Sequence, residues 1–341
     1  MKKYNKKYNE WVEKKNKKNI KNNSKRNRRK KRKKKYPYDS IEDLYGRKTK
    51  IKIIEKPLTA PKYFSIIDNT DETIAYFNKV IHYFKSKNYR TNALFFDVEE
   101  VEYITIDAIM YLLAIIYNIN NSKNNILRVG GNLPKKDDIK DKFIKSGFLK
   151  ILKNKDMNIL NDSQGILYGN SVSGNSVGKI IELSKKYLGS EKSIYFLYNI
   201  IIELMENTIS HAYIDSYFVN SWYLYATCNN NIISITFIDT GLGIPETIYK
   251  KIPEKIVDIM NIKNTKYILS ALQGGFRTKT QKDYRGKGLP EIFEYYKKDK
   301  IKKLKIISCY EKIDTDKKDC ALNLNEYLHG TVFYWEIDGN N

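Results

Sequence analysis

Hydrophobic residues recur along the chain from about residue 60 at spacings that predict alternating helices and strands. The first predicted helix, residues 73–87, has its apolar positions on one face: Ile74, Phe77, Val80, Ile81 and Phe84. A short apolar run at 93–98 is typical of a buried strand, and a helix at 105–118, a strand at 126–129 and a helix at 137–146 follow. This alternation predicts a small α/β unit at 61–155.

The pattern changes to longer apolar elements after residues 156–176, a stretch rich in Asn, Ser and Gly that we interpret as a linker. The second half is predicted to contain helices at 177–188, 193–213 and 289–296 and strands at 221–227, 232–238, 303–308 and 331–337. The predicted fold class is therefore α/β, with a second α/β domain at 177–341.

Positive charge is concentrated at the N-terminus. The formal net charge is +23, and residues 1–35 contain 19 Lys and Arg against Glu10 and Glu13, a net +17. Such a segment repels itself and buries little, so we expect a disordered basic tail at 1–35 and a linker at 36–60. The tail is either a solvated segment or a contact for a polyanion, and its charge does not distinguish nucleic acid from an anionic membrane surface.

The cysteines and the apolar runs limit the class of protein. Cys228, Cys309 and Cys320 are an odd number without CxxC spacing, which argues against a disulfide framework and against a zinc site. The longest apolar stretch, 108–117, is about half of what a membrane span needs. We expect a cytoplasmic protein with no membrane span.

A polar stripe marks the helix predicted at 193–213. In ELMENTISHA, Glu203, Asn207 and His211 recur every four residues and therefore lie along one face. Polar groups on an otherwise apolar helix are costly to bury unless they bind something. An Asn amide oxygen suits Mg²⁺, and a carboxylate one turn away suits a base that deprotonates an attacking water.

Three further segments place glycines beside polar groups. In ITFIDTGLGIP an apolar strand ends at Asp239, whose carboxylate is suited to accept a hydrogen bond from an adenine amino group, and Gly241 and Gly243 follow. QGGFRTKTQKDYRGKGLPEIF is a basic, glycine-bracketed flap that leads into a helix, an arrangement suited to a triphosphate. In HGTVFYWEI, Thr331 opens the last predicted strand.

Together, these four segments resemble the motif series of the GHKL superfamily of ATP-binding proteins. The resemblance spans about 177–338 and implies a Bergerat α/β sandwich, with a mixed, mostly antiparallel sheet and helices on one face. It implies Glu203 as the general base, Asn207 as the Mg²⁺ ligand and Asp239 as the adenine acceptor. The full set of residues implied to bind ATP is Asn207, His211, Asp239, Gly241, Gly243, Ile244, Thr278, Lys279, Thr280, Gly286, Lys287, Gly288, Leu289 and Thr331.

The first unit resembles a STAS domain, the fold of anti-sigma factor antagonists. The likeness is carried by FFDVEEVEYITIDAIMYLLAII and LRVGGNLPKKDDIKDKFIKSGF. In that family a serine in the turn before the helix is phosphorylated, whereas Asp107 stands at the matching position here. Either Asp107 carries a permanent negative charge in place of a phosphate, or it is an early-helix carboxylate favoured by the helix dipole.

Three functions remain open within the GHKL resemblance. Histidine kinases are disfavoured, because none of His82, His211 and His329 lies in an HExxxP-like setting before the ATP unit. An ATPase switch of the MutL, gyrase or Hsp90 kind is preferred, and a serine or threonine kinase of the anti-sigma kind is the alternative. The third is a partner-binding module without catalysis. Each implies a protein partner, and association of two copies is left open.

Overall fold

The computed structural model describes residues 57–85, 93–121, 128–153, 165–188, 195–211, 221–249, 266–275 and 288–339. The chain divides into two compact units, 1–50 and 51–341, and every described residue belongs to the second. The basic tail at 1–35, most of the linker at 36–60 and most of the glycine-bracketed flap therefore lie outside the described residues.

The first part of the fold, residues 57–153, is here called the N-terminal layer. Its strands pair in parallel: β1 (Leu58–Thr59), β3 (Ala93–Asp97) and β5 (Arg128–Gly131) form one sheet, and β2 (Tyr63–Phe64) and β4 (Tyr103–Ile104) form another. Its helices are α3 (Thr70–Lys85), α4 (Ile106–Asn121), α5 (Asp137–Lys145) and α6 (Phe148–Lys153). The α/β class expected for this unit is therefore observed.

The second part contains a five-stranded sheet in the order β6-β7-β8-β10-β9. Its strands are β6 (Leu167–Gly169), β7 (Trp222–Asn229), β8 (Ile232–Asp239), β9 (Lys302–Asp314) and β10 (Ala321–Asp338). The sheet was expected to be mixed and mostly antiparallel, and every described pairing in it is antiparallel.

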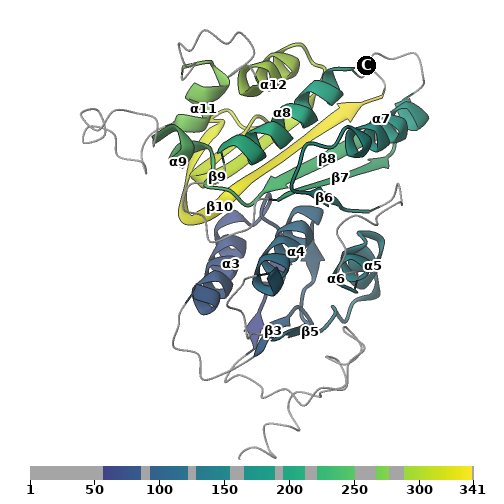
Figure 1. Cartoon of the computed structure of the whole chain (residues 1–341), viewed down its shortest axis with the longest axis vertical. Coiled ribbons are helices and arrows are strands. Elements are labelled where there is room, and N and C mark those ends of the chain that lie inside the picture. The colour runs from purple at the N-terminus through teal and green to yellow at the C-terminus, as the bar shows by residue number, and fades with distance from the viewer. Residues whose placement is uncertain are drawn as a thin grey trace, which may run out of the picture. The chain divides into compact units, whose positions relative to one another are not determined.

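Two groups of helices cover the two faces of this sheet (Figure 1). The second part contributes α7 (Gly174–Leu188), α8 (Tyr195–His211), α9 (Ile244–Tyr249), α11 (Tyr267–Leu272) and α12 (Gly288–Lys297). Side chains of α7, α8, α11 and α12 pack with Leu224, Phe237 and Phe333 on one face, here called the α8 face. Their neighbours Tyr223, Ile238 and Val332 point to the other face and pack with α3 and α4.

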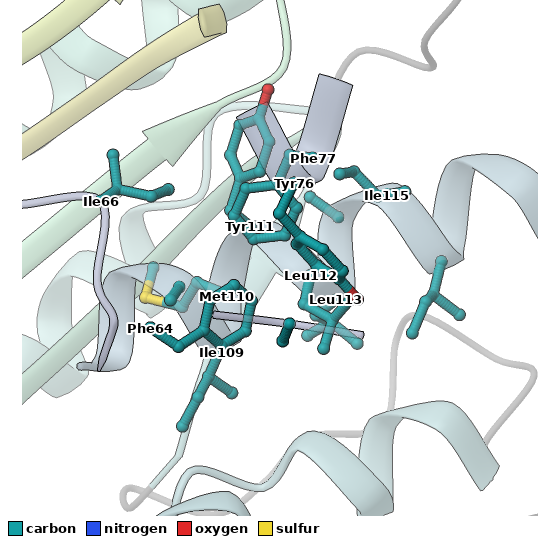
Figure 2. Packing of buried hydrophobic residues seen from close by; sticks show 14 of the residues in the cluster. Phe64, Ile66, Tyr76, Phe77, Ile109, Met110, Tyr111, Leu112, Leu113 and Ile115 are labelled. Atoms are coloured by element: carbon teal, nitrogen blue, oxygen red, sulfur yellow. The ribbon is translucent and has the colours of Figure 1, made fainter. Parts of the chain in front are cut away.

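Both faces of the sheet are therefore covered by helices. The expectation of helices on one face alone is wrong for this chain. The apolar sequence of α4 explains why: ten consecutive residues of that helix, from 107 to 116, are at most 3% exposed. A helix that is apolar all round is buried all round. Figure 2 shows part of this packing, with Phe77 of α3 beside Tyr111 of α4.

Polar contacts fasten the N-terminal layer to β9 and β10. The buried ammonium of Lys312 donates to the carbonyl oxygen of Ile67 and to Thr70 Oγ1, the latter at 3.1 Å. The carboxylate of Asp71 accepts the backbone N–H of Asn325 at 3.0 Å. These contacts join segments about 250 residues apart in the sequence, so the N-terminal layer and the sheet belong to one compact unit.

Candidate functional site

The candidate site is a row of polar side chains across three neighbouring strands, at the end of β8 and in the middle of β10 and β9. Asp239 is the Cα partner of Thr331 on β10, and Thr331 is the partner of Ser308 on β9. Side chains alternate along a strand, so Asp239 lies on the same face as Phe237, and Thr331 on the same face as Phe333. Asp239, Gly241, Gly243, Ser308, Gly330 and Thr331 are here called the Asp239 cluster.

The carboxylate of Asp239 is partly buried and only partly satisfied by the protein. The backbone N–H of Gly241 donates to Asp239 Oδ1 at 2.8 Å. Burial raises the pKa of Asp239 to about 6, against the opposing effect of hydrogen bonds from Gly241 and from the Thr331 hydroxyl. A carboxylate in this setting is suited to accept one further hydrogen bond from a neutral donor, such as an amino group of a ligand.

Two glycines allow the backbone segments of the Asp239 cluster to approach closely. Gly330 has φ +96°, and a Cβ there would lie 2.1 Å from the carbonyl oxygen of Asp239. Gly243 has φ +86°, and a Cβ there would lie 2.6 Å from Ser308 Oγ. Both positive φ angles disfavour other residues, and at Gly330 the added Cβ would also overlap backbone atoms.

Ser308 of β9 links β10 to the start of α9 through its hydroxyl group. Its Oγ accepts the backbone N–H of Ile244 at 2.9 Å and donates to the carbonyl oxygen of Gly330 at 2.9 Å. It also lies 3.2 Å from Thr331 Oγ1. The sequence motifs did not indicate Ser308, because a single serine within an apolar strand carries no recognisable signal.

The polar stripe of α8 is partly buried on the same side of the sheet. Glu203 and Asn207 are both partly buried, whereas Glu206 is exposed. Burial raises the pKa of Glu203, and the nearby carboxylates of Glu206 and Glu291 raise it further. A carboxylate with a raised pKa is closer to the range in which it exchanges a proton at neutral pH.

The start of α12 lies directly against Glu203. A Cβ built on Gly288 would lie 2.6 Å from Glu203 Oε2 and 3.1 Å from Glu203 Cβ. The glycine at the beginning of α12 therefore lets the helix N-terminus approach the carboxylate. A helix N-terminus favours negative charge, so the same end of α12 is suited to a phosphate group.

The remaining predicted residues are placed as follows. Ile244 begins α9 and packs against the core of the α8 face, and Leu289 packs there from α12. His211 is the last residue of α8, and only its backbone is described. Thr278, Lys279, Thr280, Gly286 and Lys287 lie outside the described residues.

Asp107 occupies a closed site instead of a surface. It is 0% exposed, and its Oδ2 accepts the backbone N–H groups of Ile66 at 2.6 Å and Ile67 at 3.3 Å. Asp107 is therefore not exposed to a partner, and of its two interpretations the structure fits the early-helix carboxylate. Its carboxylate ties the start of α4 to the segment after β2.

No three His, Cys, Asp or Glu side chains gather into a metal-binding cluster in the part of the chain that the structure describes. Within the same residues, no helix has both the length and the apolar character needed to cross a membrane. No protein-family model matches the chain, and no curated protein matches it.

Proposed function

We propose that the chain binds Mg-ATP on the α8 face of the sheet and hydrolyses it, acting as an ATP-gated switch of the GHKL kind. The observation that carries the proposal is the Asp239 cluster: a partly exposed carboxylate, paired with Thr331 on the neighbouring strand and flanked by Gly243 and Gly330, where positive φ and close neighbours disfavour a side chain. The adenine amino group would donate to Asp239, beside the Thr331 hydroxyl.

The α8 stripe and the start of α12 support the position of the triphosphate. Asn207 would hold Mg²⁺ through its amide oxygen, with phosphate oxygens and waters as the other ligands. The N-terminus of α12, next to Glu203, favours an anion. Glu203 would accept the proton of the water that attacks the terminal phosphate, and burial that raises its pKa suits this role.

Hydrolysis is preferred to phosphotransfer within the chain because the position that matches the STAS phosphoacceptor holds a buried aspartate. Asp107 has no hydroxyl group and no exposed surface, so it cannot accept a phosphoryl group as serine does. Transfer to a serine or threonine of a separate protein is the competing reaction.

The proposal is tested with the full-length protein and ATP labelled at the γ-phosphate. Calorimetry with Mg²⁺ and ATP measures binding, and the release of labelled phosphate is compared with label retained on protein, with and without candidate partners. We expect Glu203→Gln to retain binding and to lose turnover by about a hundredfold or more. Glu206→Gln removes an exposed carboxylate from the same helix. It is the matched control and should turn over normally.

Asn207→Ala tests binding instead of turnover. It should remove the Mg²⁺-dependent part of ATP binding. Absence of binding heat at millimolar ATP and Mg²⁺ would overturn the proposal. Normal turnover by Glu203→Gln would remove Glu203 as the base, and label retained on a partner protein would replace hydrolysis by phosphotransfer.

A further inference from the structure

Tyr111 connects the N-terminal layer to the Asp239 cluster. It lies on α4, it is 2% exposed, and its hydroxyl donates to the carbonyl oxygen of His329 at 2.7 Å. The ring is held by Phe77 of α3, with the ring centroids 4.8 Å apart (Figure 2). Burial, and then the charge of Asp239, raise the pKa of Tyr111 above its usual range, so the hydroxyl keeps the proton that it donates.

The carbonyl that Tyr111 contacts belongs to an irregular part of β10. The pairing of β10 with β9 passes from Leu328–Cys309 to Thr331–Ser308, so His329 and Gly330 form a bulge between two regular stretches. Opposite the bulge, Cys309 has φ +53°. A bulge bends its strand locally, so the position of the residues after it depends on what holds the bulge.

The residues held by this bulge are those of the candidate site. Gly330 lies against the backbone of Asp239, and Thr331 is the strand partner of Asp239. The Gly330 carbonyl is fixed by Ser308 from within the sheet, whereas the His329 carbonyl is fixed by Tyr111 from the N-terminal layer. Two successive carbonyl groups are thus held from opposite sides.

We propose that Tyr111 is a positioning residue for the adenine side of the nucleotide site, and that the N-terminal layer thereby sets the preference of the site for adenine. The inference rests on the proposed function. Tyr111 acts through His329 and Gly330, which place the Thr331 hydroxyl and the Asp239 carboxylate at the spacing that the adenine ring requires. It acts without touching the nucleotide.

The test compares ATP with ITP, which carries an oxygen in place of the adenine amino group. Binding of each nucleotide with Mg²⁺ is measured by calorimetry for the wild-type full-length protein, Tyr111→Phe and Tyr76→Phe. Tyr76 is the matched control, because it is also buried in the same aromatic cluster and its hydroxyl contacts the carbonyl oxygen of Leu58 at 3.5 Å, away from the Asp239 cluster. Thermal unfolding of all three proteins accompanies the binding data.

We expect Tyr111→Phe to weaken ATP binding by about threefold to tenfold, the range for one lost hydrogen bond, and to change ITP binding by less than about twofold. Tyr76→Phe should leave the ratio of the two affinities at the wild-type value, even if it lowers the melting temperature as much. A purely structural role for Tyr111 predicts equal losses for ATP and ITP, and that result would overturn the inference.

The inference and the proposed function fail in different ways. If the wild-type protein binds neither nucleotide, the proposed function is wrong and the inference is overturned with it. If the wild-type protein prefers ATP and Tyr111→Phe keeps the same preference, the proposed function stands and Tyr111 has no positioning role.

Discussion

Asp107 and Asp239 are both buried at least in part where a regular element begins or ends, yet their surroundings differ. Asp107, in the first turn of α4, is closed off completely and accepts two backbone N–H groups from residues about 40 positions earlier. Asp239, the last residue of β8, accepts the N–H of Gly241 and the Thr331 hydroxyl and remains partly exposed among glycines. The first carboxylate is closed to any ligand, whereas the second remains partly exposed and can accept one.

The comparison shows why one aspartate fastens the fold and the other is a candidate for binding. Burial raises the pKa of both, so the pKa alone does not separate them. What separates them is exposure, because Asp107 is fully buried and Asp239 is partly exposed. A sealed carboxylate with donors from a distant segment is a structural link, whereas an open one beside residues without side chains leaves room for a donor from outside.

The largest expected effect comes from removing each carboxylate in turn. Asp107→Ala should lower the free energy of unfolding by about 3 kcal/mol, because two buried N–H groups lose their acceptor. Asp239→Ala should change it by less than about 1 kcal/mol but weaken ATP binding by about tenfold to a hundredfold, the worth of a hydrogen bond to a charged group. Urea unfolding measures the free energy of unfolding of both variants, and calorimetry measures their ATP affinity.

The contrast between the two aspartates would fail if both substitutions had the same effects on stability and on ATP affinity. A loss of stability in Asp239→Ala equal to that in Asp107→Ala would make Asp239 a structural link as well. Normal ATP affinity in Asp239→Ala would remove it from the nucleotide site.

How far the sequence predicts these two sites depends on how local their interactions are. The helices α3, α4 and α8 and the strands β3 and β8 were predicted within a few residues, because each repeats its apolar positions with a clear period. The two-residue strands β1, β2 and β4 were missed, because two residues carry no period.

The packing of the N-terminal layer on the sheet was also missed, although α4 is apolar on every side. An apolar helix sequence predicts that the helix is buried but does not indicate which surface it packs against. For the same reason, the motifs indicated Asp239 and Thr331 but gave no sign of Ser308 or Tyr111. A hydroxyl group that acts through a backbone carbonyl leaves no spacing in the sequence to recognise.

A second prediction concerns the close approach beside Asp239. Gly330→Ala should lower the free energy of unfolding by about 2–3 kcal/mol, because Gly330 has φ +96° and the added Cβ would overlap the Asp239 carbonyl oxygen. Gly178→Ala, in α7 with no neighbour within 4 Å of the new Cβ, is the matched control and should raise stability by about 0.5–1 kcal/mol. Chemical denaturation of both variants gives the difference, and equal stability would contradict the assigned strain.

A third prediction concerns the approach of α12 to Glu203. The Cβ of Gly288→Ala would displace the Glu203 carboxylate, from which it would be separated by only 2.6 Å. We expect turnover of ATP to fall by about tenfold, because a displaced base is less well positioned to accept the proton of the attacking water. The KM for ATP should change less. Steady-state kinetics measure both constants, and a KM effect without a turnover effect would place the strain on nucleotide binding instead.

The smallest expected effect is the pH dependence of ATP binding. The carboxylate is the form of Asp239 that accepts a hydrogen bond from adenine, and its pKa is raised to about 6, so the accepting form is nearly complete at pH 7.5 and becomes the minority below pH 6. ATP affinity should therefore fall by about threefold to fivefold between pH 7.5 and 5.5. The triphosphate itself also titrates in this range.

Asp239→Asn separates the two titrations, because its amide has no proton to lose while the nucleotide keeps its own pKa. Affinities are measured by calorimetry at several pH values for both proteins, and the difference between the two profiles isolates the contribution of Asp239. The Asn variant should bind more weakly at pH 7.5 and show a shallower decline toward pH 5.5. If the two profiles ran parallel, the proton lost with rising pH would belong to the nucleotide, and Asp239 would be closed to the ligand in the way that Asp107 is closed to solvent.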